Sequence, residues 1–206
     1  MAEVFLASRN PKKLEEMQRI LEPLAPGVQV LGLDDVPAYD EPVEDQPDFA
    51  GNALLKARAA VAATGLPSLA DDSGLCVDAL NGMPGVLSAR WGGPPKSDER
   101  NNTLLLAQLC DVPDERRAAH FTCAVAFCRP DRDGDAAEVV VHGQMTGRVL
   151  REVRGTGGFG YDVLFAADGY DVTTAELSRE DKDAISHRGR ALREIAPSVV
   201  DGLRRG

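Results

Sequence analysis

Two adjacent carboxylates, Asp71 and Asp72, end a short apolar run and are followed at once by Ser73 and Gly74. Neighbouring like charges repel each other and burial disfavours both, so such a pair needs a compensating partner. A divalent cation, or a proton held in place for chemistry, would relieve that cost. The Ser73 hydroxyl and the flexible Gly74 suit a loop that lets a phosphate come close. Taken alone, the segment fits a solvated turn equally well.

The segment from Leu6 to Leu14 joins an expected strand to an expected helix. Backbone N–H groups and the helix dipole attract anions at such a junction. Ser8 and Asn10 add hydrogen-bonding groups, and Lys13 lies in the first helical turn, where a cation is unfavourable unless it meets an anion. These three residues are phosphate-binding candidates, although an Asn-capped helix with surface lysines is the simpler account of this segment by itself.

An acidic stretch, residues 34–48, precedes a helix that contains Lys56. Glu44 in this stretch is a candidate to join Asp72 on a magnesium ion, because magnesium prefers a few carboxylates together with phosphate oxygens. Lys56 is a candidate phosphate ligand. Most acidic loops are merely solvated, and taken alone this stretch fits that account as well.

A glycine-rich loop, residues 155–162, contains Phe159, Gly160, Tyr161 and Asp162. Its glycines allow the backbone to approach a flat or charged ligand closely. Phe159 and Tyr161 are candidates to stack on a base, and Asp162 is a candidate acceptor for a ring N–H or amino group. A mobile loop whose aromatic rings return to the core is the alternative.

A further polar segment begins at Lys182 and ends with Ser186, His187 and Arg188. Ser186 can cap the last helix, which places His187 and Arg188 in the first turn. Two potential cations at this positive helix end need an acceptor, and the keto oxygen of a purine would serve. A surface location is the commoner explanation for any one of them.

The composition excludes several classes of protein. The net charge of −10 argues against a nucleic-acid-binding surface. No apolar run reaches the roughly 18 residues of a membrane-spanning helix, and because the N-terminus opens in a strand-like segment we expect no signal peptide. The four cysteines lack paired spacing, which argues against zinc and favours reduced thiols in a cytoplasmic protein.

The order of expected elements is that of an α/β protein. Apolar periodicity and capping residues predict strands at 3–7, 28–31, 68–70, 118–129 and 136–150, with short strands and turns over 74–91. They also predict helices that begin at Pro11, after Asp48, after Ser97 or Asp98, and after Ser186; the helix after Asp48 should run to about Thr64 and end at Gly65. Residues 130–135 read as a hairpin turn. We expect a mixed sheet with flanking helices in an elongated, two-lobed single domain, residues 1–206, with a long central β-hairpin.

Taken together, these segments resemble the inosine triphosphate pyrophosphatase family, also called dITP/XTP pyrophosphatases. The family motif Thr-x-Asn-x-x-Lys matches residues 8–13, and Glu-Asn-Ala-x-x-Lys-Ala matches residues 51–57. Ala-Asp-Asp-Ser-Gly-Leu occurs at residues 70–75, Gly-Thr-Gly-Gly-Phe-Gly-Tyr-Asp at 155–162, and Ile-Ser-His-Arg at 185–188 after Lys182. The chain departs from the pattern at Ser8 for Thr, at Gly51 for Glu and at Val163 for Pro.

The resemblance implies a magnesium-dependent enzyme that hydrolyses ITP, dITP and XTP to the monophosphate and pyrophosphate. It implies that Asp72 and Glu44 bind the metal, and that Asp72, with Asp71 as its neighbour, accepts a proton from the attacking water. Phosphate-binding residues would be Ser8, Asn10, Lys13, Lys56 and Ser73. The base would contact Phe159, Gly160, Tyr161 and Asp162, with Lys182, His187 and Arg188 at its 6-keto oxygen. Relatives form homodimers, and the cellular use would be to keep deaminated bases out of DNA and RNA.

Two other functions remain open at this point. A Maf-like pyrophosphatase for pyrimidine or modified triphosphates shares the opening segment of this chain but lacks its Ser-His-Arg and glycine-loop segments. A nucleotide-binding module without catalysis would bind ITP without releasing pyrophosphate; the intact Asp71–Asp72 pair argues against it.

Overall fold

The computed structural model describes residues 2–130 and 137–204. The helices are α1 (Pro11–Leu21), α2 (Phe49–Thr64), α3 (Asp98–Gln108), α4 (Arg179–Ile185) and α5 (His187–Arg204). Short 3-10 helices are η1 (Asp78–Leu80), η2 (Gly85–Arg90), η3 (Asp114–Arg116) and η4 (Gly160–Val163). The strands are β1 (Glu3–Leu6), β2 (Gln29–Leu31), β3 (Ser68–Val77), β4 (Ala118–Arg129), β5 (Ala137–Val149) and β6 (Phe165–Ala167). Within this part of the chain, no helix is both long and apolar enough to span a membrane.

The strands of the described residues form one six-stranded sheet in the order β2-β1-β3-β4-β5-β6. β1 pairs in parallel with β2 and with β3, whereas β5 and β6 are antiparallel. The predicted α/β fold with a mixed sheet and flanking helices is therefore confirmed. β4 and β5 are adjacent, as a hairpin requires, but the predicted turn at residues 130–135 lies outside the described residues except for Pro130.

The chain divides into two compact units, and the divisions fall within β3, β4 and β5. Unit 1 contains Met1–Asp72, Cys123–Gly143 and Arg188–Gly206, and unit 2 contains Ser73–Thr122 and Gln144–His187. Each unit has its own hydrophobic core.

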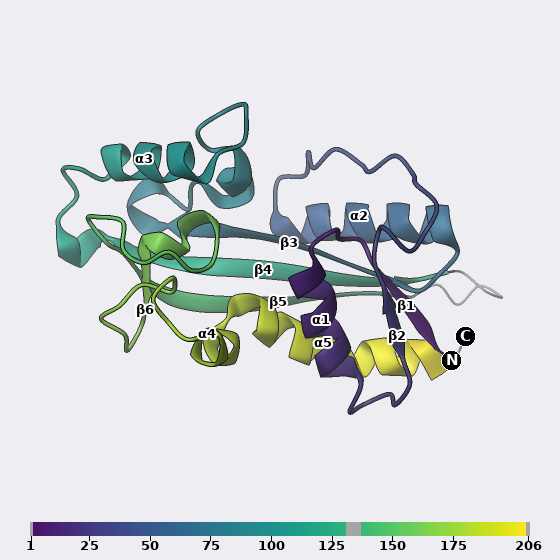
Figure 1. Cartoon of the computed structure of the whole chain (residues 1–206). Coiled ribbons are helices and arrows are strands. Elements are labelled where there is room, and N and C mark those ends of the chain that lie inside the picture. The colour runs from purple at the N-terminus through teal and green to yellow at the C-terminus, as the bar shows by residue number, and fades with distance from the viewer. Residues whose placement is uncertain (1, 131–136, 205–206) are drawn as a thin grey trace. The chain divides into compact units, whose positions relative to one another are not determined.

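Unit 1 has helices on both faces of its strands, with α2 on one side and α1 and α5 on the other (Figure 1). Alternation along the strands fills the two sides, because successive side chains in a strand point to opposite faces. Cys123, Val125 and Phe127 pack with α1 and α5. The intervening Ala124, Ala126 and Cys128 pack with the small residues of α2.

Unit 2 is built around α3, η4 and the remaining parts of the strands. Leu105 and Leu109 of the α3 region pack with Leu75 and with Phe165 of β6 in a cluster of buried residues. Phe121 packs edge-on against Phe165, with ring centroids 4.8 Å apart. This core carries the glycine-rich loop on its α3 side.

Most predicted boundaries agree with the structure to within a residue or two. Asp48 caps α2 through the backbone N–H of Gly51, and Gly65 ends that helix in the left-handed conformation (φ +68°). Ser97 caps α3 through the N–H of Arg100. These agreements reflect capping rules that depend on a few local residues.

The prediction that the third strand ends at Ala70 was wrong, because β3 continues through the acidic pair to Val77. The polar sequence Asp-Asp-Ser-Gly resembles a turn when read alone. In the structure it lies on a central strand of the sheet, where both faces are covered and the two carboxylates meet specific partners. Register in the sheet has outweighed local turn propensity here.

Candidate active site

Asp71 and Asp72 are consecutive residues of β3 and therefore point to opposite faces of the strand. The same alternation governs the preceding residues, since Leu69 packs with α1 and α5 whereas Ala70 packs with α2. Asp71 accordingly faces α1 and α5, and Asp72 faces α2. The strand thus separates two like charges that would repel each other if their side chains shared one face.

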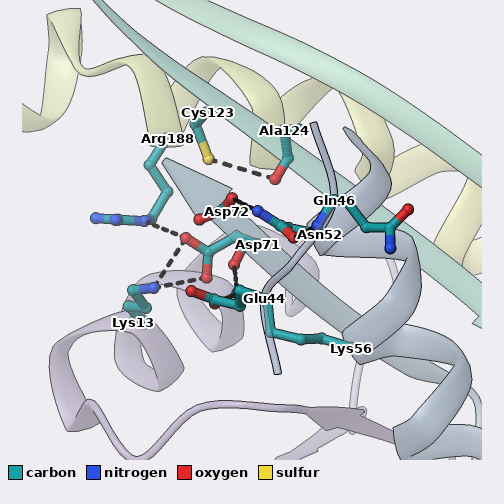
Figure 2. A network of polar contacts seen from close by, with 10 residues as sticks. All are labelled: Lys13, Glu44, Gln46, Asn52, Lys56, Asp71, Asp72, Cys123, Ala124 and Arg188. Carbon is teal, nitrogen blue, oxygen red and sulfur yellow. Dashed lines mark hydrogen bonds and ion pairs between the residues drawn. The ribbon is translucent and has the colours of Figure 1, made fainter. Parts of the chain in front are cut away.

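On the α1 and α5 side, Asp71 forms ion pairs with two cations (Figure 2). Its Oδ1 and Oδ2 atoms lie 2.6 and 2.8 Å from the Nζ of Lys13. The Nε of Arg188 donates to Oδ2 at 3.3 Å. Both cations belong to the first turn of a helix, where the dipole disfavours positive charge, and Asp71 supplies the compensating negative charge.

This arrangement keeps Asp71 ionised. Burial alone would raise the pKa of its carboxyl group, but the charges of Lys13 and Arg188 outweigh burial and hold the pKa well below its usual range. A carboxylate with so low a pKa is a poor proton acceptor near neutral pH. Its geometry suits a counter-ion that fixes the two cations.

On the α2 side, Asp72 accepts a hydrogen bond from Asn52, whose Nδ2 lies 2.8 Å from its Oδ2. Asn52 is fully buried in α2, and its own Oδ1 accepts from the backbone N–H of Gln46 at 3.0 Å. The amide therefore connects Asp72 to the acidic stretch that precedes α2. Asp72 itself is only half-buried, so it remains reachable from outside the core.

Lys56, one helical turn after Asn52, ties the acidic stretch to β3. Its Nζ donates to Glu44 Oε1 at 2.6 Å and to the backbone carbonyl of Asp71 at 2.7 Å. The side chain of Glu44 keeps about a third of its surface exposed, at 31%. The structure thus brings Glu44, Lys56, Asp71 and Asp72 into one polar network (Figure 2).

The carboxylates of this network suit a magnesium ion that also binds a substrate. Among the described residues, no group of three or more His, Cys, Asp or Glu side chains is arranged to hold a metal ion. Magnesium is usually bound through one or two carboxylates together with substrate phosphates and water, and not by an all-protein cage. Asp72 and Glu44 match that donor set.

The other predicted residues of unit 1, Ser8 and Asn10, lie in the loop between β1 and α1. The Ser8 Oγ accepts from the backbone N–H of Asn10 at 3.1 Å, and Asn10 carbonyl accepts from the N–H of Lys13 at 3.0 Å. The loop therefore leads directly into the turn that carries Lys13. Ser73, the residue after Asp72 in β3, is half-buried and belongs to unit 2.

Asp162 organises the predicted residues of unit 2. It is buried, and its Oδ2 accepts from the backbone N–H of Phe159 at 2.9 Å and from Lys182 Nζ at 2.5 Å. Its Oδ1 accepts from the Thr174 hydroxyl at 2.8 Å. Gly158 has a φ of +74°, and a Cβ there would lie 2.2 Å from Asp162 Oδ2, so only glycine fits this position.

The two aromatic residues of the loop have different environments. Phe159 is 58% exposed, and Lys182 Nζ lies 5.8 Å from the centre of its ring. Tyr161 is buried, and its hydroxyl donates to the Ser88 carbonyl at 2.9 Å. Burial, and secondly the charge of Asp98, raises the pKa of Tyr161 above its usual value. The ring accessible to a ligand is therefore that of Phe159.

His187 and Arg188 are neighbours in the first turn of α5. The His187 ring stacks on Phe121, with centroids 5.0 Å apart and an angle of 12° between the planes. As predicted, Ser186 comes immediately before this helix.

Sequence reasoning missed the role of Asn52 as the partner of Asp72. A signal was present, because an Asn in the interior of an Ala-rich helix is unfavourable unless its amide is used. Its position four residues before Lys56 also places the two on the same face of α2.

Comparison with known proteins gives consistent results. The model of the Ham1 family matches residues 4–198. The dITP/XTP pyrophosphatase of Nocardia farcinica is 58% identical over 201 residues, which cover 97% of this chain and 96% of the relative. The dITP/XTP pyrophosphatase of Cutibacterium acnes is 52% identical over 205 residues, 98% of each chain.

Solved structures agree. The crystal structure of the nucleoside-triphosphatase / dITP/XTP pyrophosphatase from Mycobacterium abscessus has a TM-score of 0.79 at 52% identity, covering 95% of this chain and 99% of that one. A HAM1 protein from Coxiella burnetii has a TM-score of 0.86 at 39% identity, covering 98% of this chain and 100% of the other.

Proposed function

The chain belongs to the Ham1 family, and we propose that it hydrolyses the deaminated purine triphosphates ITP, dITP and XTP to the nucleoside monophosphate and pyrophosphate. This substrate class is supported by the sequence identity that extends over nearly the whole chain to relatives named dITP/XTP pyrophosphatases. The observation that supports the mechanism is that the two adjacent carboxylates of β3 have different partners: Asp71 pairs with two cations, whereas Asp72 accepts from an amide.

Asp72 is the proposed proton acceptor for the attacking water. It is half-buried on the α2 face and held by the Asn52 amide. A hydrogen bond from a neutral amide orients the carboxylate without supplying a neighbouring positive charge. Asp71, paired with Lys13 and Arg188, instead acts as their counter-ion.

Magnesium is the proposed metal, and Asp72 with Glu44 would hold it. When bound, such an ion neutralises the charge of the phosphates and so favours attack at phosphorus. Lys56 keeps Glu44 in place through the 2.6 Å ion pair. Phosphoryl transfer depends mainly on positioning and charge stabilisation, so the chain needs no covalent nucleophile.

The remaining residues are proposed to bind the substrate. The phosphates would be held by Ser8, Asn10, Lys13, Lys56 and Ser73. Phe159 would stack on the base beside Gly160 and Asp162, while the buried Tyr161 supports the loop. Lys182, His187 and Arg188 would donate to the 6-keto oxygen. Adenine presents an amino donor at that position, and leaving a buried donor unpaired costs about 1–3 kcal/mol.

We further propose that the protein is a cytoplasmic homodimer. The four cysteines, Cys76, Cys110, Cys123 and Cys128, are in the reduced form, which suits a reducing compartment. The dimer rests on the family resemblance, and light scattering at micromolar concentration tests it; a monomer would contradict it.

The deciding experiment is pyrophosphate release from ITP, XTP, GTP, ATP, dTTP and UTP, each with and without magnesium. We expect strong magnesium-dependent cleavage of ITP and XTP, with little of GTP or ATP. A preference for dTTP or UTP would favour a Maf-like activity. Tight ITP binding with no pyrophosphate release would indicate a binding module without catalysis.

A further inference from the structure

Helix α3 holds both backbone polar groups, the N–H and the carbonyl, of one glycine in the glycine-rich loop. The Asp98 Oδ2 accepts from the backbone N–H of Gly160 at 2.7 Å. The Asn102 Nδ2 donates to the carbonyl of the same Gly160 at 3.0 Å. Asp98 and Asn102 are four residues apart in α3 and therefore share one face of that helix. All three residues belong to unit 2.

The chemistry of the two side chains matches the two ends of the residue. An ionised carboxylate can only accept, so Asp98 suits the N–H, whereas the Asn102 amide can donate to the carbonyl. Exchanging the oxygen and nitrogen of Asn102 would place two acceptors against each other, so this contact defines the orientation of the amide. In that orientation the buried Oδ1 of Asn102 has no hydrogen-bond partner among the described residues. Asn102 thus satisfies Gly160 and leaves its own oxygen unpaired.

The residue held in this way directly follows the exposed ring of Phe159. Gly160 has a φ of +61°, a conformation that residues other than glycine rarely adopt. On the other side, the backbone N–H of Phe159 donates to Asp162 Oδ2. Three side chains, Asp98, Asn102 and Asp162, therefore fix the backbone on which the Phe159 ring is carried. An exposed ring has few side-chain contacts of its own, so its position depends on this backbone.

We propose that Asp98 and Asn102 are positioning residues for recognition of the base, acting through Gly160 to place the Phe159 ring. The inference rests on the proposed function, because it assumes that Phe159 stacks on the substrate base. The inference gives α3 a part in base recognition, although Asp98 and Asn102 lie outside the glycine-rich loop and its motif. Loss of this support should weaken binding of the base and leave binding of the phosphates unchanged.

The test compares a ligand that has a base with one that has none. For each variant we would measure kcat and KM for ITP, and the inhibition constant of inorganic tripolyphosphate. Asn102→Asp has the same shape but presents an acceptor to the Gly160 carbonyl, and we expect KM for ITP to rise about tenfold or more. The tripolyphosphate constant should stay within about twofold of the wild-type value.

Asp98 offers a graded comparison. Asp98→Asn keeps an oxygen that can accept from Gly160 and should change KM for ITP by less than about threefold, whereas Asp98→Ala should behave like Asn102→Asp. Glu99→Ala and Thr103→Ala are matched controls, because both residues are exposed on the same helix, each next to one of the tested residues. Hydrogen exchange of the Gly160 amide in the free protein should accelerate in Asp98→Ala and stay unchanged in both controls.

Each outcome decides the question. Equal changes in KM for ITP and in the tripolyphosphate constant, or no change in either for Asp98→Ala, would overturn the inference. Because Asp98 is exposed, its variant remains informative even if Asn102→Asp does not fold. A wild-type protein that cleaves no purine triphosphate would overturn the proposed function itself, and this inference with it.

Discussion

Asp71→Asn should destabilise the fold, whereas Asp72→Asn should leave stability nearly unchanged and lose turnover, although the two substitutions are identical and adjacent. Asp71→Asn removes the negative charge that faces Lys13 and Arg188. The new asparagine side chain would present to these two donors either its amide N–H₂ group, which is itself a donor, or its single oxygen in place of two carboxylate oxygens. Asp72→Asn keeps an oxygen that can accept from Asn52, so the contact across the α2 face survives.

The expected size of the Asp71 effect follows from its burial. The Asp71 side chain is 6% exposed, while Lys13 and Arg188 are 21% and 14% exposed. Removing one partner of a buried ion pair costs about 3–5 kcal/mol, and the residual exposure of the cations places this case at the lower end, about 3 kcal/mol. For a chain of this size, each kcal/mol of lost stability lowers Tm by about 2–4 °C, so the expected fall in Tm is about 6–12 °C.

Asp72→Asn should change the free energy of unfolding by no more than about 0.5 kcal/mol, because it leaves packing and the main hydrogen bond in place. Turnover should fall at least about 100-fold, the lower range for loss of a positioned proton acceptor. Thermal unfolding followed by circular dichroism, together with pyrophosphate release from ITP, measures both effects. Asp34→Asn is the control, since its side chain is 83% exposed and its pair with Arg9 contributes little.

Two results would refute this reasoning. Near wild-type turnover in Asp72→Asn would remove Asp72 from the role of proton acceptor. An Asp71→Asn variant that unfolds at the wild-type temperature would show that the network around Lys13 and Arg188 does not stabilise the fold.

Three further predictions concern pH and the substrate. The pKa of Asp71 is lowered in the folded protein, so its contribution to stability is present above the unfolded pKa of about 4 and is lost as the pH falls below that value. Denaturant unfolding measured at a series of pH values should show a loss of stability in acid that is smaller in Asp71→Asn than in the wild type. Gly158→Ala would place a methyl group 2.2 Å from Asp162 Oδ2 and so disrupt the ion pair between Asp162 and Lys182. KM for ITP should rise while inhibition by tripolyphosphate persists, and an unchanged KM would exclude the loop from base binding. Arg188→Ala should lose affinity for ITP more than for ATP, and equal losses in competition assays would contradict its contact with the 6-keto oxygen.

Local rules predicted α1, α2, α3 and α5, whereas α4 was not predicted. The caps Asp48 and Ser97 and the terminating Gly65 were recognisable from residue type and spacing, and each makes the backbone contact expected of it. Such signals involve neighbours in sequence, so they do not depend on how the sheet assembles. The two long strands that became β4 and β5 were equally clear from their apolar runs.

The acidic pair shows where local reasoning failed. Read locally, Asp71 and Asp72 are two like charges side by side at the end of a strand, which predicts either one compensating partner at that place or a solvated turn. A strand instead assigns each carboxylate to a different face, and the partners of each come from segments distant in sequence. Whether Asp71 meets α1 and α5 or α2 depends on register in the sheet, which the sequence around the pair does not determine.

The contacts that sequence reasoning missed share one property. Asn52, Asp98 and Asn102 are polar residues in helices to which the sequence assigned no role in the site, and each uses its side chain on a residue of another segment. Helix geometry places such side chains at intervals of four residues, so Asn52 acts with Lys56, and Asp98 acts with Asn102. In both pairs a helix fixes a backbone group or a carboxylate of the segment that it covers, which is β3 for α2 and the glycine-rich loop for α3. The residues proposed to contact substrate are therefore supported by a second set of polar residues, and substitutions in that set should alter the binding of substrate without removing any group that touches it.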